Sequence, residues 1–170
     1  ANVSIADYIE MIRLKTAVLL AASLKTGAII AGAEASDCDY IYQFGIHIGL
    51  AFQLKDDLLD VYGVQEKFGK VSGGDIIAGK KTYLYLKALE TAGSEADTFR
   101  SLYAAQDMES SEKIAKVKEV FNRMNIETHT RQLINYYYQK ALRDLSAISL
   151  PEEAMESLTE YAAWLMEREN

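Results

Sequence analysis

The stretch that decides the fold is GLAFQLKDDLLD, residues 49–60. Its apolar residues recur at the three- and four-residue spacing of a helix, and its acidic residues gather at the C-terminal end. At about 100° per residue, one arc of about 100° holds Gln53, Asp56, Asp57 and Asp60, whereas Lys55 falls on the far side. The predicted helix therefore presents three carboxylates and an amide on one face, and its own lysine does not neutralise them.

Outward from this helix, the rest of the chain carries the same helical spacing. It has 170 residues and a single proline, so we predict an all-α fold, a helical bundle, in a single domain over residues 1–170. Ser4 with Asp7 predicts a capping box, and Asp37 predicts the cap of the second helix. The expected helices cover about 4–32, 37–62, 81–92, 95–105, 111–124, 127–146 and 152–168.

Composition limits the possible partners and the compartment. The chain has 18 Lys plus Arg against 25 Asp plus Glu, which argues against nucleic acid or an anionic membrane surface as a partner. The apolar stretch 18–33 contains Lys25 and Gly27, so we expect no membrane span. The single cysteine, Cys38, forms no internal disulfide, which indicates a reducing compartment, and we expect the cytoplasm.

The acidic arc predicts a metal site. Three carboxylates at a helix C-terminus repel one another and oppose the negative end of the helix dipole. Mg²⁺ binds a few carboxylates together with substrate phosphate oxygens and water, so the arc predicts Mg²⁺ and a phosphate or diphosphate ester. The simpler interpretation is a solvated acidic face, but leucines and Phe52 cover the other sides of this helix.

Three lysines are candidates for binding such an anion. Lys15 lies in an otherwise apolar helix, which predicts either a buried lysine with an anionic partner or one that reaches solvent. Lys70 and Lys80 bracket a Gly-rich loop, where glycine lets the backbone approach a phosphate. The loop lacks the spacing of a P-loop, so a nucleotide triphosphatase is not supported.

These motifs occur in a characteristic order: Lys15-Thr16-Ala17, residues 52–60, Phe68-Gly69-Lys70, Gly74-Asp75-Ile76 and Gly79-Lys80-Lys81-Thr82. In order and spacing they resemble the C-terminal half of trans-prenyl diphosphate synthases, the farnesyl and geranylgeranyl diphosphate synthase family. The resemblance covers about residues 1 to 85. It implies a large helical bundle in which two aspartate-rich motifs hold Mg²⁺ against an allylic diphosphate, with isopentenyl diphosphate as the second substrate and commonly a homodimer.

The resemblance also implies a role for each residue. Asp56 would be the direct metal ligand, with Asp57 and Asp60 supporting it, and Asp75 would support the same site. The residues that would contact the diphosphate are Lys15, Lys70 and Lys80. Catalytic roles beside the allylic carbocation fall to Lys15, Thr16 and Gln53. The hydrocarbon tail would pass Gly45 and Gly49, which the residues alone equally assign to close helix packing.

Two departures set limits on this interpretation. The family's first aspartate motif is absent from the sequence, and a full member is nearly twice as long, so we expect a fragment that has no turnover alone. The start at Ala1 in place of Met also fits processing or a boundary within a longer chain. The alternatives are a non-catalytic helical subunit of a heteromeric prenyl synthase and, ranked lower, a terpene cyclase, whose second motif has a different composition and spacing.

Overall fold

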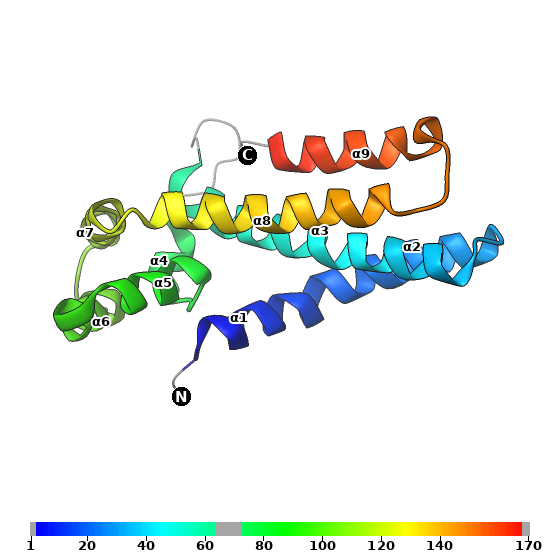
Figure 1. Cartoon of the computed structure of the whole chain (residues 1–170). Coiled ribbons are helices and arrows are strands. Elements are labelled where there is room, and N and C mark those ends of the chain that lie inside the picture. Colours follow the sequence, from blue (N-terminus) through cyan, green and yellow to red (C-terminus); the bar gives the residue numbers. More distant parts are fainter. Residues whose placement is uncertain (1–2, 64–72, 168–170) are drawn as a thin grey trace. The chain divides into compact units, whose positions relative to one another are not determined.

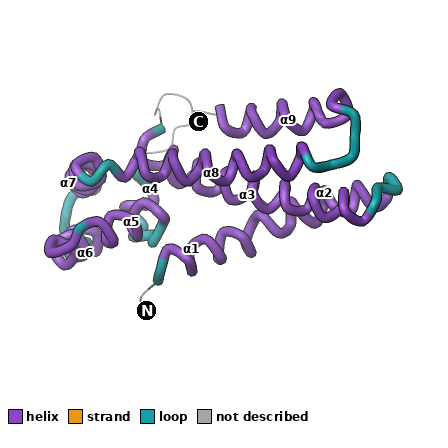
Figure 2. The backbone as a smooth tube through the Cα atoms, viewed as in Figure 1, coloured by secondary structure: helices purple, strands orange, loops and turns teal. Residues whose placement is uncertain are grey.

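The computed structural model of the chain describes residues 3–63 and 73–167. Within these ranges every regular element is a helix, which confirms the all-α prediction (Figure 2). In chain order (Figure 1) the elements are α1 Ile5–Ile12, η1 Arg13–Ala17, α2 Val18–Ile30, α3 Ala35–Tyr62, α4 Gly74–Ile77, α5 Tyr83–Thr91, η3 Gly93–Glu95, α6 Ala96–Ala104, α7 Ser110–Arg123, α8 Ile126–Ser146 and α9 Glu152–Glu167. No helix in these ranges is long and apolar enough to cross a membrane.

The chain divides into two compact units. Of the described residues, unit 1 holds 3–8, 56–63 and 73–131, and unit 2 holds 9–55 and 132–167. The helices α1, α3 and α8 therefore each contribute residues to both units. The single domain expected over residues 1–170 stays a prediction.

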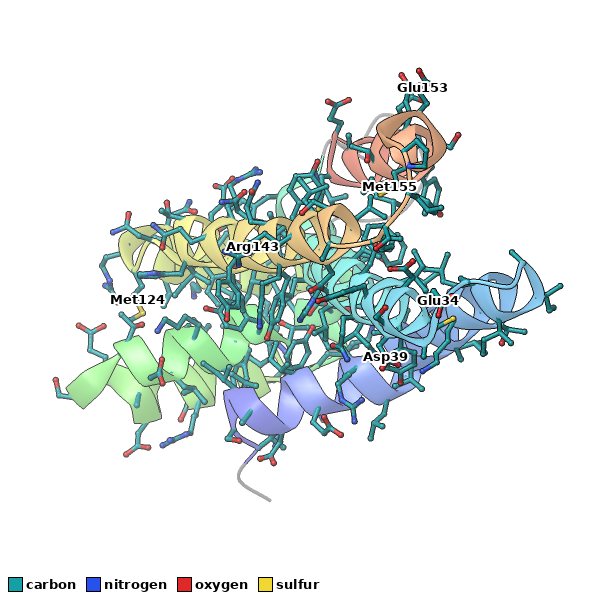
Figure 3. The ribbon with its side chains drawn as sticks, turned by 45° about the vertical axis from the view of Figure 1, so that its right-hand side comes forward. Glu34, Asp39, Met124, Arg143, Glu153 and Met155 are labelled. Carbon is teal, nitrogen blue, oxygen red and sulfur yellow. The ribbon has the colours of Figure 1, made fainter. Side chains whose placement is uncertain are left out.

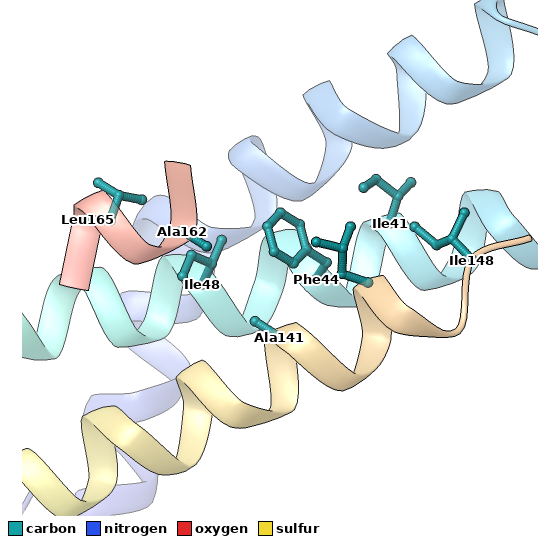
Figure 4. Packing of buried hydrophobic residues seen from close by; sticks show 8 residues of the cluster. Ile41, Phe44, Ile48, Ala141, Ile148, Ala162 and Leu165 are labelled. Atoms are coloured by element: carbon teal, nitrogen blue, oxygen red, sulfur yellow. The ribbon is translucent and has the colours of Figure 1, made fainter. Parts of the chain in front are cut away.

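The core of unit 2 forms where α3, α8 and α9 meet (Figure 4). The α3 residues Ile41, Phe44 and Ile48 share one helical face and are almost fully buried. Alanines on the partner helices allow close approach to these large side chains. The residues that complete the cluster are Ala141 and Leu145 of α8, Ile148 after it, and Ala162 and Leu165 of α9. In Figure 1, α8 and α9 run in opposite directions along this core.

Two glycines of α3 bring its backbone against the preceding helical segment of unit 2. A Cβ atom at Gly45 would lie 2.5 Å from the Cα of Ala21, and one at Gly49 would lie 2.8 Å from the Cα of Ala17. No side chain fits into such a gap. The structure thus shows both glycines in close helix packing, the simpler of the two interpretations that the sequence allowed.

Polar contacts tie the helices of unit 2 together. The Asp37 carboxylate accepts a hydrogen bond from the Ser149 N–H at 3.1 Å, and α3 already begins at Ala35. The prediction that Asp37 caps this helix was therefore wrong. Lys55 is 9% exposed and donates to the carbonyl of Met166, near the end of α9. At the α2 to α3 turn, Asp39, labelled in Figure 3, accepts from Lys25 at 2.6 Å.

The core of unit 1 is aromatic. Helix α7 packs against α4, α5 and α6. The ring centroids of Tyr85 and Tyr103 lie 4.3 Å apart, and those of Phe99 and Phe121 lie 6.0 Å apart. The predicted capping box is confirmed: Ser4 N–H donates to the Asp7 carboxylate at 2.9 Å, and Asp7 N–H donates to the Ser4 hydroxyl at 3.1 Å.

Candidate active site

The first candidate residue in unit 1 is Asp57, at the acidic end of α3. Its Oδ2 accepts a hydrogen bond from the hydroxyl of Tyr8, a residue 49 positions earlier in the chain. Tyr8 is 3% exposed. Burial raises the pKa of Asp57 to about 7, and the hydrogen bond from Tyr8 opposes this shift. Asp75 and Asp56 raise it further because their negative charges lie nearby.

Asp60, one turn further along α3, holds the segment that begins at Gly73. Its carboxylate Oδ2 accepts from the Asp75 N–H at 2.9 Å. Its backbone carbonyl accepts from the Gly73 N–H at 2.6 Å. Gly73 has φ of 88°, in the left-handed region that favours glycine, and a Cβ at Gly74 would lie 3.3 Å from Asp60 Oδ1. The two glycines therefore let this backbone approach the carboxylate closely.

The third part of the site is the ion pair of Asp75 and Lys80. The Lys80 ammonium group donates to Asp75 Oδ1, and the Lys80 N–H donates to the Asp75 carbonyl at 3.0 Å. The Tyr103 hydroxyl donates to the Lys80 carbonyl at 2.8 Å. The hydrogen bond to Asp75 raises the pKa of Lys80, so its side chain stays charged, and 63% of that side chain is exposed. Lys80 thus offers a positive charge to a dissolved anion.

The carboxylates of unit 1 have the donor chemistry that Mg²⁺ prefers. Hard oxygen ligands from a few aspartates are the usual protein share of such a site. The mutual repulsion that helps to raise the pKa of Asp57 would be relieved by a cation. Within residues 3–63 and 73–167, however, no three His, Cys, Asp or Glu side chains converge on one point that would hold a metal ion. The residues therefore fit Mg²⁺ in kind, with substrate oxygens and water completing its ligands.

Unit 2 holds the candidates Lys15, Thr16 and Gln53. Lys15 is exposed and Thr16 is half-buried. The option of a buried Lys15 is therefore wrong, and the option of a lysine that reaches solvent is confirmed. Both residues lie in η1, a π-helical segment over Arg13–Ala17, whereas the sequence predicted one regular helix. Such segments inside α-helices occur frequently at functional positions.

The structure thus gathers part of the predicted set. Asp57, Asp60, Asp75 and Lys80 are linked in unit 1 by direct bonds or by the charges acting on Asp57. Asp56 belongs to the same unit and acts on the pKa of Asp57. Lys70 lies outside the described residues. The roles assigned to all of these residues stay predictions.

Sequence reasoning missed Tyr8 and Tyr103, the two buried tyrosines that donate into this site. Each sits at an ordinary apolar position of an amphipathic helix. Nothing in a single sequence separates a tyrosine that donates to a distant carboxylate from one that only packs. His47 was expected to be ordinary packing, and in unit 2 its Nδ1 lies 2.5 Å from an oxygen of Asp144.

Comparison with known proteins assigns the family. A sequence profile of the polyprenyl synthetase family matches residues 1–156. This chain belongs to that family. A short chain isoprenyl diphosphate synthase of Methanothermobacter thermautotrophicus is 36% identical over 164 residues, which are 96% of this chain and 50% of the relative. The chain spans about half the length of the curated relatives it matches.

Solved structures of the family have the same fold. A crystal structure of a geranylgeranyl pyrophosphate synthase matches with a TM-score of 0.91 at 41% identity, covering 99% of this chain and 53% of that one. A geranylgeranyl pyrophosphate synthase from Corynebacterium glutamicum, complexed with isoprenyl diphosphate and magnesium, matches with a TM-score of 0.86 at 32% identity. That match covers 98% of this chain and 48% of the other. The chain therefore has the fold of about half of such a synthase.

Proposed function

We propose that this chain is the part of a trans-prenyl diphosphate synthase that carries the second aspartate motif. The reaction breaks the bond between the allylic carbon and its diphosphate, joins that carbon to the double bond of isopentenyl diphosphate, and releases a proton to the departing diphosphate. The observation that carries the proposal is that a member of the polyprenyl synthetase family links Asp57, Asp60, Asp75 and Lys80 in unit 1.

The residues of unit 1 would bind the diphosphate and its metal. Bound Mg²⁺ would stabilise the negative charge that develops on the leaving diphosphate. Asp56 would be its direct ligand, supported by Asp57 and Asp60. Lys80 would bind the diphosphate oxygens, because its ammonium group is exposed and charged. The C. glutamicum relative, complexed with isoprenyl diphosphate and magnesium, supports this choice of ligand and metal.

The remaining roles rest on the motifs alone. Lys15 and Lys70 would bind the same diphosphate, and the Thr16 carbonyl and the Gln53 amide would stabilise the allylic carbocation. We expect the intact enzyme to be a cytoplasmic homodimer. We expect no condensation by the isolated chain, because the first aspartate motif is absent from its sequence.

A chimera tests the proposed reaction. In it, the segment of the M. thermautotrophicus synthase that matches this chain is replaced by the corresponding 164 residues of this chain. With labelled isopentenyl diphosphate, dimethylallyl diphosphate and Mg²⁺, the chimera should form longer prenyl diphosphates. Asp56→Asn in the chimera should lower turnover at least about tenfold, as loss of a charged transition-state contact does.

Two results would count against this account. A chimera that is folded by circular dichroism and yet forms no product would contradict the proposed function. Condensation by the isolated chain would contradict the expectation that it is inactive alone. The unmodified M. thermautotrophicus synthase, assayed in parallel, serves as the positive control.

A further inference from the structure

Asp60 has bonds that the aspartate motif alone does not predict. Its carboxylate accepts from the backbone N–H of Asp75 at 2.9 Å, and its carbonyl accepts from the Gly73 N–H at 2.6 Å. Residues 15 and 13 positions further along the chain are thus fixed to the last turn of α3. A side chain used in this way holds backbone in place, which is a different task from holding a metal ion.

The two tasks place different demands on residue 60. A backbone N–H needs an acceptor oxygen, and the neutral amide oxygen of asparagine supplies one. A Mg²⁺ ion needs a hard, anionic oxygen, which asparagine lacks. Asp60→Asn therefore preserves the first task and removes the second, whereas Asp60→Ala removes both.

The bond from Asp60 continues to the cation of the site. The Asp75 carboxylate is 13% exposed and accepts from the ammonium group of Lys80. The backbone of Lys80 is held as well, through its N–H to the Asp75 carbonyl at 3.0 Å and through its carbonyl to the Tyr103 hydroxyl at 2.8 Å. Asp60 thus stands at one end of a continuous chain of bonds that ends at an exposed positive charge.

We propose that Asp60 is a positioning residue that acts through Asp75 to fix Lys80 for the diphosphate. The inference rests on the proposed function, because it names the group that Lys80 binds. It divides the three aspartates by task, with Asp56 facing the metal chemistry and Asp60 holding the backbone that carries the lysine.

The test titrates inorganic pyrophosphate into the whole chain at several Mg²⁺ concentrations, by calorimetry. We expect Asp60→Ala to weaken pyrophosphate binding about tenfold and Asp60→Asn to weaken it at most about threefold, with the Mg²⁺ concentration for half-maximal binding unchanged. Asp56→Asn should raise that Mg²⁺ concentration. Asp97→Asn, on the exposed face of α6 in the same unit, is the matched control.

Hydrogen exchange gives a second readout that needs no ligand. The backbone amides of Asp75 and Lys80 should exchange at least about tenfold faster in Asp60→Ala than in the wild type, and Asp60→Asn should restore their protection. If the wild-type chain binds no pyrophosphate, the proposed function fails for this chain, and exchange alone still decides whether Asp60 positions Asp75 and Lys80.

The opposite pattern would overturn the inference. Asp60→Asn would then lose pyrophosphate binding as fully as Asp60→Ala and demand more Mg²⁺, as expected of a direct metal ligand. Unchanged exchange at Asp75 and Lys80 in Asp60→Ala would overturn it equally. If Asp60→Ala does not fold, the Mg²⁺ dependence of Asp60→Asn decides between the two tasks by itself.

Discussion

One helix serves two regions that are held together in different ways. The α3 residues of unit 2 include Phe44 and Ile48, which are buried among aliphatic side chains of α8 and α9. The α3 residues of unit 1 include Asp57 and Asp60, which accept hydrogen bonds from Tyr8 and Asp75. The comparison teaches that substitutions in the first region should mainly cost stability. In the second region they should mainly cost the geometry of a charged site.

The largest loss of stability is expected for Phe44→Ala in unit 2. Phe44 is 1% exposed, so its removal takes away buried apolar surface and leaves a cavity. We expect the free energy of unfolding to fall by about 3–5 kcal/mol, measured by urea unfolding. Tyr40→Ala, at a 41% exposed position of the same helix, is the control and should cost much less. Equal losses for the two variants would contradict the assignment of this core.

A smaller loss is expected where α3 meets the preceding helix of unit 2. In Gly45→Ala the new methyl group would lie 2.5 Å from the Cα of Ala21, so the backbones must move apart. Overpacking of this kind costs about 1–3 kcal/mol. Gly27→Ala is the matched control, because no atom lies within 4 Å of its new methyl group and alanine favours a helix. Gly27→Ala should leave the melting temperature unchanged or raise it, and the reverse order of the two variants would refute the close contact.

Asp57 should show an effect that depends on pH. Its pKa of about 7 lies above the value of 3.8 in the unfolded chain, so the folded chain binds this proton more tightly. Without metal, the group therefore contributes stability at low pH that is lost as the pH rises through about 7. In EDTA, Asp57→Asn should be more stable than the wild type by about 1–3 kcal/mol at pH 8 and nearly equal to it at pH 5. Urea unfolding across this range would reject the prediction if the difference did not vary with pH.

The smallest effect on stability, and a clear one on binding, is expected for Lys80→Met. The Lys80 side chain is 63% exposed, and exposed ion pairs contribute about 0–1 kcal/mol. Pyrophosphate affinity in Mg²⁺ should nevertheless fall about fivefold or more, because a charge-assisted contact to phosphate is lost. Lys116→Met, which also removes an exposed, paired lysine of unit 1, should leave the affinity unchanged. A fall of equal size in both variants would indicate a general loss of positive charge and not a specific contact.

The fold was largely predictable because helical spacing is a local signal. The ends of α5 to α9 lie within two residues of the predicted ones. The single turn α4 was missed, since its four residues contain a glycine and are too few to show a period. Asp37 was assigned as a cap because its partner, the Ser149 N–H, is 112 residues away and leaves no local trace.

The candidate site was predictable only in its residue types. The spacing of Asp56, Asp57 and Asp60 indicated carboxylate chemistry, but the carboxylate contacts of Tyr8 and Asp75 depend on how distant segments meet. The pKa of Asp57 is likewise set by burial, which no local pattern fixes. A sequence therefore names the groups of such a site more readily than their tasks.

The central claim is that the acidic end of α3 and Lys80 belong to a diphosphate site that requires Mg²⁺. The most direct measurement is calorimetric titration of the whole chain with inorganic pyrophosphate, in Mg²⁺ and in EDTA, for the wild type and Asp56→Asn. We predict saturable binding in Mg²⁺, none in EDTA, and at least about tenfold weaker binding by Asp56→Asn. Binding of equal strength in EDTA, or an Asp56→Asn variant that binds like the wild type, would contradict the claim.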